Sequence, residues 1–299
     1  MWLANKVPRK LRHGLMMIYS NTRRWHYLRR QQTGEPVEVH LPKGAGFRLY
    51  PEGQIAELLY TSRFEWRELA WVSAYLKPGM NVVDIGANIG LYSILADQAI
   101  QPGGRVLAFE PSAETHARLL RNLSLNQAAS VTPLKLALAD ARGGHLVLKR
   151  DPGFRDGDRY LSAQPAPGSS VADQTGDAGD IETVPITTLD DYLAAEAAAP
   201  RKIDFLKMDI EGGEYSVFRG AAKTLTANAG ILLMFECTPQ GCQRAGHTQD
   251  DLYEFLRAMG FELYCWDRSS NRWDTRRELL LAAGNVWACR RNELLPRLS

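Results

Sequence analysis

The segment VVDIGANIG, Val82 to Gly90, is the feature that most constrains the fold of this chain. The apolar residues around Asp84 are typical of a buried strand, and Gly86 and Gly90 supply backbone without side chains in the turn that follows. A helical pattern begins directly after Gly90. A strand that runs through such a loop into a helix is a unit of an α/β sheet, and the loop lies at the edge where these sheets bind ligands.

Strand and helix patterns alternate from Met80 onward, which predicts a Rossmann-like, mostly parallel sheet with helices on both faces. The strands are expected at 81–85, 105–110, 131–136, 203–208, 230–236, 261–266 and 285–289. The loops after these strands should therefore gather at one edge of the sheet.

Composition divides the chain into a basic N-terminal arm at 1–34, a hairpin and helical segment at 35–79, and a main domain at 80–299. Within the main domain, 151–182 is rich in Gly, Pro, Ser, Ala and Asp and poor in large apolar residues. We expect this segment to be a mobile insertion, with a lid over the active site as the alternative to plain disorder.

The arm carries eight basic residues and no acidic one, interleaved with apolar side chains. This pattern suits a helix on an anionic membrane surface, or a helix that packs on the domain with its basic side in water, and the sequence does not separate the two. No signal peptide or membrane-spanning stretch is apparent, and the four cysteines form no metal motif. We expect a cytoplasmic protein, peripheral to the membrane if the arm contacts it, that does not bind nucleic acid.

The spacing of the loop separates two ligand classes. Dinucleotide sites expect GxGxxG with a pyrophosphate on the helix amides, whereas this loop is GxxxG and places Asp84 where a pyrophosphate would be repelled. A carboxylate there suits the ammonium group of S-adenosylmethionine, and Asn88 can hold the loop through its amide. Adenosylmethionine is therefore favoured over a nicotinamide cofactor, and methyl transfer over hydride transfer.

Two further positions agree with a nucleoside. Glu110 ends the second strand, where a carboxylate can accept hydrogen bonds from ribose hydroxyls. Leu138 and Asp140 follow the third strand, in a turn suited to packing and capping an adenine ring. Asp140 could equally initiate a turn with the residues after it.

Carboxylates also end the later strands. The strand at 203–208 runs into KMDIEGGE, which holds Asp209 and Glu211, and Glu236 ends the next strand. Asp209 and Glu236 should lie close together if the two strands are neighbours. Any of these three carboxylates could take the proton of a hydroxyl nucleophile as general base. A divalent metal there is the less favoured alternative, and Glu211 and Glu214 could instead cap the next helix.

Several motifs, taken together, resemble those of the FkbM-type methyltransferases. They are VVDIGANIGLYS, AFEPSAETHARLLRNLSLN, the ALAD turn, TTLDDYL and FLKMDIEGGEYSVFRGA followed by MFE. The resemblance covers roughly Glu65 to Glu236. It implies a seven-stranded sheet with an antiparallel last strand and adenosylmethionine as methyl donor. It places cofactor contacts at Asp84, Gly86, Asn88, Gly90 and Glu110, and Asp209 at the catalytic edge.

The resemblance also implies O-methylation of a carbohydrate hydroxyl, as in surface glycans, or of a secondary metabolite. Nitrogen as nucleophile and the oligomeric state stay open. A nicotinamide-dependent oxidoreductase and a non-catalytic nucleoside-binding or membrane-surface scaffold are the alternatives to an O-methyltransferase.

Overall fold

The computed structural model describes residues 24–41, 44–50, 54–61, 64–150, 159–162, 181–291 and 295. The chain forms two compact units. The first comprises Met1–Leu69 with Pro152–Asp158, and the second comprises Ala70–Asp151 with Arg159–Ser299. Each unit is described below by itself.

The first unit contains a helix at 24–33, the antiparallel strands β1 (Val37–His40) and β2 (Gly46–Leu49), and helix α2 (Gln54–Tyr60). The predicted hairpin is therefore present. The helical part of the segment expected at 35–79 is divided into two helices, α2 and α3 (Trp66–Tyr75). Glu65, just before α3, has a φ of 22°, which no helix tolerates.

The helix at 24–33 buries one side and exposes the other. Tyr27 is 0% exposed and lies 5.6 Å from the ring of Tyr60, whereas Trp25 and Leu28 are 54% and 38% exposed. Residues 1–23 lie outside the described part of the chain, so membrane contact by the basic arm stays a prediction. Among the described residues, no helix has both the length and the apolar character needed to cross a bilayer.

The second unit is built on an eight-stranded sheet in the order β13-β12-β14-β11-β10-β3-β4-β5. Strands β5, β4, β3, β10 and β11 are parallel, and β14 runs antiparallel between β11 and β12. This confirms the Rossmann-like fold class, with β13 added to the expected strands as a hairpin on β12. The strands are β3 (Asn81–Ile85), β4 (Arg105–Phe109), β5 (Val131–Leu134), β10 (Phe205–Met208), β11 (Leu232–Glu236), β12 (Glu262–Asp267), β13 (Arg272–Asp274) and β14 (Asn285–Cys289).

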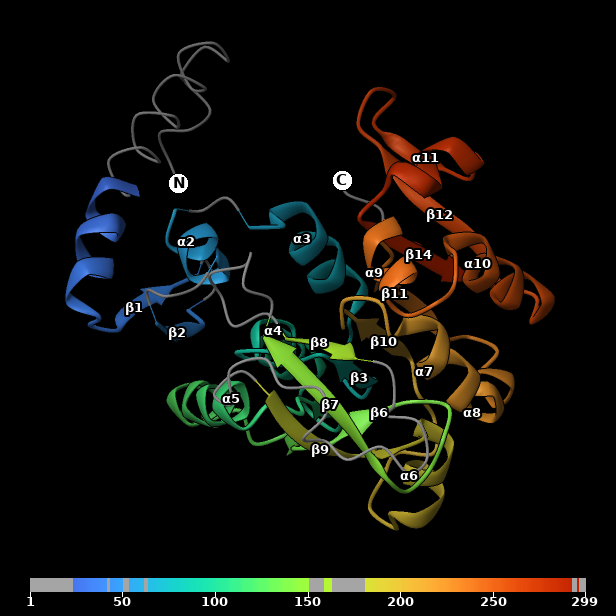
Figure 1. The fold of residues 1–299 in the computed structure, drawn as a ribbon, viewed down its shortest axis with the longest axis horizontal. Coiled ribbons are helices and arrows are strands. Elements are labelled where there is room, and N and C mark those ends of the chain that lie inside the picture. The colour runs from blue at the N-terminus through green and yellow to red at the C-terminus, as the bar shows by residue number, and fades with distance from the viewer. Residues whose placement is uncertain are drawn as a thin grey trace. The chain divides into compact units, whose positions relative to one another are not determined.

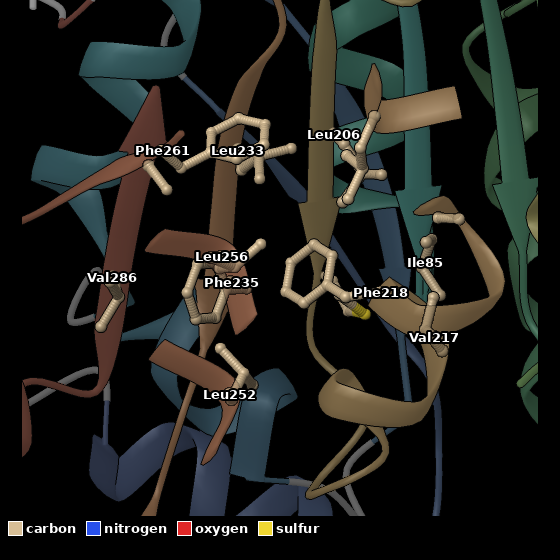
Figure 2. Close-up of a cluster of buried hydrophobic side chains, with 14 of the residues drawn as sticks. Ile85, Leu206, Val217, Phe218, Leu233, Phe235, Leu252, Leu256, Phe261 and Val286 are labelled. Carbon is tan, nitrogen blue, oxygen red and sulfur yellow. The ribbon is translucent and has the colours of Figure 1, made fainter. Parts of the chain in front are cut away.

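Alternate residues of these strands serve two hydrophobic layers. On one face, Phe218 of α7 meets Phe235 of β11 edge to face at 5.1 Å, inside the cluster drawn in Figure 2. On the other face, Trp71 of α3 lies 6.1 Å from Trp287 of β14. The helices of this unit are α4 (Leu91–Ile100), α5 (Ala113–Leu125), α6 (Leu189–Ala195), α7 (Glu214–Gly220), α8 (Ala222–Ala227), α9 (Pro239–Arg244), α10 (Gln249–Ala258) and α11 (Arg277–Ala282).

A second, four-stranded sheet has the order β6-β9-β7-β8, and Figure 1 shows its long strand β7 beside β9. Its strands are β6 (Ala137–Leu138), β7 (His145–Arg150), β8 (Arg159–Ser162) and β9 (Ile181–Thr187). Strand β8 and the first residues of β9 lie within 151–182, the segment expected to be a mobile insertion, and β8 pairs with β7. The mobility of the segment stays a prediction. Residues 151–158 and 163–180 lie outside the described ranges. Leu146, Leu148, Val184 and Ile186 give this sheet its own small core.

The first helix after β10 joins the two sheets. This helix, α7, ends at Gly220, and α8 begins after Ala221. A Cβ atom on Gly220 would lie 2.0 Å from the carbonyl oxygen of Ala139, which directly follows β6. Gly220 therefore allows α7 to pack against the backbone of the smaller sheet.

We predict that Gly220→Ala destabilises the protein by about 3 kcal/mol, because the added methyl group overlaps a backbone atom that cannot rotate away. Gly230→Ala is the matched control, since a Cβ atom there meets nothing within 4 Å. Urea unfolding followed by circular dichroism measures both. Equal stability of the two variants would contradict the packing argument.

Candidate active site

Strands β3 and β10 are adjacent and parallel, and their register places Lys207 beside Asp84. The Nζ atom of Lys207 lies 4.0 Å from Oδ1 of Asp84 and 3.4 Å from Oδ2 of Asp209. It also donates to the carbonyl oxygen of Gly86 at 3.4 Å and lies 5.1 Å from the ring centre of Tyr92. One buried cation therefore links the predicted cofactor loop to the predicted catalytic edge. A lysine within an otherwise apolar strand is the sequence signal that marks it.

Asp84 is 0% exposed. Ser93 Oγ donates to its Oδ2 at 2.6 Å, and burial raises its pKa above the usual range. In this structure the side chain of Asp84 holds Ser93 and Lys207 rather than reaching open space. Its predicted contact with the cofactor ammonium stays a prediction.

The loop after β3 needs its glycines for two reasons. Gly86 and Gly90 have φ values of 74° and 92°, and Asn88 has a φ of 49°. A Cβ atom on Gly86 would lie 2.0 Å from the carbonyl oxygen of Asp209, and one on Gly90 would lie 2.7 Å from Leu119. The sequence interpretation gave ligand access as the reason for these glycines. The structure adds close packing of the loop against the end of β10.

Glu110 closes the same loop from the next strand. One carboxylate oxygen accepts from the backbone amide of Asn88 at 2.9 Å, and the other accepts from the amide of Ser112 at 3.0 Å. The side chain is buried, and burial raises its pKa to about 7. Because each carboxylate oxygen has two lone pairs, Glu110 keeps acceptor capacity for the ribose hydroxyls it was predicted to bind. The hydrogen bond from the backbone amide of Asn88 to Glu110 therefore holds the loop in place.

The two positions predicted to contact adenine have different surroundings. Leu138 is 2% exposed and belongs to the main hydrophobic core through β6, and its contact with adenine stays a prediction. Asp140 accepts from Ser216 Oγ at 2.9 Å and forms an ion pair with Arg219. These two partners on α7 were not predicted from the sequence, because they are far along the chain. An adenine contact by Asp140 stays a prediction.

The three predicted catalytic carboxylates converge. Because Met208 pairs with Phe235 at the ends of β10 and β11, the next residues, Asp209 and Glu236, become neighbours. Oxygen atoms of Asp209, Glu211 and Glu236 all lie within 4.8 Å of one another. This confirms that the strands are adjacent and that the carboxylates meet.

Each carboxylate of the cluster has a distinct setting. Glu211 has a φ of 60° and pairs with Arg244 at 3.2 Å, while Asp209 pairs with Lys207. Burial, followed by the charges of Asp209 and Glu211, raises the pKa of Glu236 to about 9. Glu236 therefore keeps its proton at neutral pH.

Glu214 follows Glu211 in the chain, but its side chain accepts hydrogen bonds from backbone amides instead of joining the carboxylate cluster. Its Oε1 atom accepts from the amides of Ile210 and Gly212 at 3.2 and 3.3 Å. Burial raises its pKa to about 7. Glu214 lies in the first turn of α7, but it holds the turn between β10 and α7 and makes no side-chain cap at the start of the helix. The side chain of Glu211 instead turns toward Arg244.

The arrangement joins a glycine loop and the buried carboxylate of Glu110 to a cluster of three carboxylates one strand away. A family model described as the methyltransferase FkbM domain matches residues 84–263. The chain belongs to the FkbM methyltransferase family. The resemblance inferred from the glycine loop and DIEGGE is thereby confirmed, and with it the prediction of a methyltransferase.

Curated relatives of this FkbM chain match it only in part. It is 29% identical over 262 residues to the AMB antimetabolite synthetase AmbE of Pseudomonas aeruginosa, covering 76% of this chain and 12% of the synthetase. It is 32% identical over 155 residues to the methyltransferase sdnD of Sordaria araneosa, covering 46% of this chain and 59% of that protein. The chain thus spans less than two thirds of either relative.

Among solved structures, the O-methyltransferase TomG of Streptomyces achromogenes, in complex with SAM, is 12% identical with a TM-score of 0.43. The match covers 75% of this chain and 79% of that one. An O-methyltransferase of Bacillus cereus in complex with SAH is 13% identical with a TM-score of 0.41, covering 74% and 77%.

We predict that Glu236→Gln makes stability less dependent on pH. Folding raises the pKa of Glu236 from 4.5 to about 9, so the folded state binds a proton that the unfolded state has lost between these values. The free energy of unfolding should therefore fall as the pH rises through this range. At pH 8 the variant should be more stable than the wild type by several kcal/mol, roughly 4 to 5, with little difference near pH 4.5.

Urea unfolding at several pH values measures this difference. Glu254→Gln, at an exposed position of α10, is the control and should follow the wild type at every pH. Parallel curves for Glu236→Gln and the wild type would show that Glu236 ionises normally in the folded protein.

Proposed function

We propose that this chain is an S-adenosylmethionine-dependent O-methyltransferase that acts on a hydroxyl group of a carbohydrate or secondary-metabolite acceptor. The observation that carries the proposal is the meeting of Asp209 and Glu236 one strand away from the loop of Gly86 and Gly90. A secondary-metabolite acceptor is supported by the similarity to one relative, an antimetabolite synthetase. The carbohydrate acceptor rests on the family resemblance alone.

The cofactor would bind at the carboxyl ends of β3 and β4, where the strand order reverses between β3 and β10. The donors and acceptors there fit it. Glu110 has free lone pairs for ribose hydroxyls, and the loop with positive φ values presents backbone atoms without side chains. When bound, adenosylmethionine supplies an electrophilic methyl group on a sulfonium.

The carboxylate edge would receive the proton of the acceptor hydroxyl. Glu236 is protonated at neutral pH and lies beside Asp209, which leaves Asp209 as the carboxylate that would accept a further proton. Bound adenosylmethionine would supply the methyl group, and Asp209 would take the hydroxyl proton as the acceptor oxygen attacks along the sulfur–methyl bond. Holding the oxygen in line with that bond supplies much of the acceleration.

A direct base is favoured over a divalent cation by the charges already in place. Asp209, Glu211 and Glu236 carry about two negative charges when Glu236 is protonated, and Lys207 and Arg244 lie within 3.4 Å of Asp209 and Glu211. The positive charges of Lys207 and Arg244 would repel a divalent cation. Three carboxylates within 4.8 Å nevertheless offer ligands that Mg²⁺ accepts, so removal of metal by EDTA is the test for a bound cation.

The alternatives differ in what now supports them. A nicotinamide-dependent oxidoreductase has no support from the family, and buried Asp84 still disfavours a pyrophosphate at the loop. A non-catalytic scaffold would bind the nucleoside and transfer nothing. Incubation of the protein with methyl-labelled adenosylmethionine and fractionated extract separates the proposed methyltransferase from both alternatives. Only a methyltransferase moves label into a glycan, lipid or small-molecule fraction.

We predict that Glu110→Ala weakens adenosylmethionine binding at least about tenfold, because it removes a charged acceptor from both the ribose and the loop amides. Isothermal titration calorimetry measures the affinity. Glu254→Ala on the surface of α10 should bind as the wild type does. Failure of the wild type to bind adenosylmethionine would refute the proposed function.

We predict that Asp209→Asn lowers kcat about 100-fold and leaves the cofactor affinity within a factor of about two. The amide cannot accept the hydroxyl proton but keeps the shape of the side chain. Asp250→Asn, an exposed partner of Arg277, is the control and should retain activity. Full turnover by Asp209→Asn would remove Asp209 from the mechanism.

The same turnover assay with and without EDTA tests whether methyl transfer needs a divalent metal. A direct base predicts equal rates. Activity that is lost with EDTA and restored by Mg²⁺ would place a cation among the three carboxylates instead.

A further inference from the structure

Two of the four cysteines lie against each other beside the carboxylate cluster. The Sγ atoms of Cys237 and Cys242 are 3.7 Å apart, and each side chain is 1% exposed. Cys237 directly follows Glu236 at the end of β11, and Cys242 lies in α9. The chain between them makes one turn capped by Thr238, whose side chain accepts from the amide of Gly241.

We propose that Cys237 and Cys242 are a modification site, a dithiol that a hydroperoxide converts to a disulfide, and that this bond shifts the turn that carries Glu211 relative to Glu236. The effect on methyl transfer rests on the proposed function. The formation of the disulfide does not.

The geometry needs only a small movement for the bond to form. A disulfide has a sulfur–sulfur distance of about 2 Å, so the two sulfur atoms must approach by roughly 1.7 Å. The bridged residues are five apart, and α9 is a helix of only six residues. A short helix with one side in solvent opens locally at low cost, which admits a small oxidant to buried thiols.

A hollow on the surface lies beside this helix. It has a volume of about 550 Å³ and its lining includes Pro239, Gln243 and Gln249. Pro239 and Gln243 are on the helix of Cys242, and Gln249 donates to the carbonyl oxygen of Cys237 at 2.8 Å. Solvent therefore reaches the immediate neighbours of both cysteines, though neither cysteine lines the hollow.

The two thiols have different roles in the reaction. The Cys237 thiol hydrogen-bonds to Cys242, which lowers the pKa of Cys242 and raises that of Cys237. Cys242 is then the better nucleophile. Its sulfur attacks a peroxide oxygen, which gives a sulfenic acid and water, and the sulfur of Cys237 displaces the second water as the disulfide forms. Two electrons pass from the two sulfurs to hydrogen peroxide, and the products are the disulfide and two waters.

Movement of α9 would be transmitted to the cluster through three contacts. Gly241 packs so closely on Gly212 that a Cβ atom on Gly212 would lie 2.2 Å from the Gly241 carbonyl oxygen. Arg244 pairs with Glu211 at 3.2 Å. His247, just beyond α9, contacts the carbonyl oxygen of Gly212 at 3.1 Å through Nε2. Pulling Cys242 toward Cys237 therefore displaces the turn of Glu211 while Glu236 stays on its strand.

The test uses the full chain, treated with hydrogen peroxide and then alkylated under denaturing conditions. Trypsin cleavage after Lys223 and Arg244 leaves both cysteines in one peptide, which should lose two hydrogens and resist alkylation until dithiothreitol is added. Cys265 and Cys289, the other buried cysteines, are the internal control and should remain alkylated. Full alkylation of the Cys237 peptide after peroxide would overturn the proposal.

The shift of the turn is measured by hydrogen exchange of the oxidised and reduced protein. We expect altered exchange in peptides that span 209–213 and 239–248, reversed by dithiothreitol and absent in Cys237→Ala treated with peroxide. A disulfide that leaves exchange in these peptides unchanged would overturn the coupling to the cluster. Neither readout needs an acceptor or adenosylmethionine, so failure here is distinct from failure of the proposed methyl transfer.

Discussion

The pairing of β3 with β10 is the interaction on which the rest of the site depends. It is the point where the strand order of the main sheet reverses, and its register puts Lys207 against Asp84 inside the sheet. A buried lysine or aspartate alone would cost several kcal/mol in lost hydration, and together they offset much of that cost. The same pairing presses Gly86 against the carbonyl oxygen of Asp209. The predicted cofactor loop and the predicted catalytic edge are therefore positioned by one strand pair.

Charge balance explains how several carboxylates can share one edge. Asp209, Glu211 and Glu236 would repel one another strongly if all were ionised in a partly buried cluster. Lys207 and Arg244 each neutralise one member, and Glu236 keeps its proton because its pKa is about 9. A cluster arranged in this way has one carboxylate ready to accept a proton and a second that already holds one. This is the arrangement that proton transfer from a hydroxyl requires.

Much of the scaffold could be predicted from the sequence because its signals are local. The limits of β3 and β14 agree with the expected strands, and those of β4, β10 and β11 differ by a residue or two. The smaller sheet could not be predicted, because β6 pairs with β9, more than forty positions along the chain, across a segment whose composition suggests a loop. The tertiary environment also changed the roles of individual residues. Leu138 belongs to the core, and Asp140 is held by partners on α7.

By itself, the sequence determined the fold class, the family and the residue types at each strand end, since strand periodicity, the GxxxG spacing and the DIEGGE segment are properties of short stretches of chain. Only the tertiary structure decided which of those residues meet. The direction in which a side chain points, its burial and its charged neighbours depend on strand register and helix packing. These contacts made Asp84 a buried partner of Lys207, gave Glu236 its proton and brought Cys237 against Cys242.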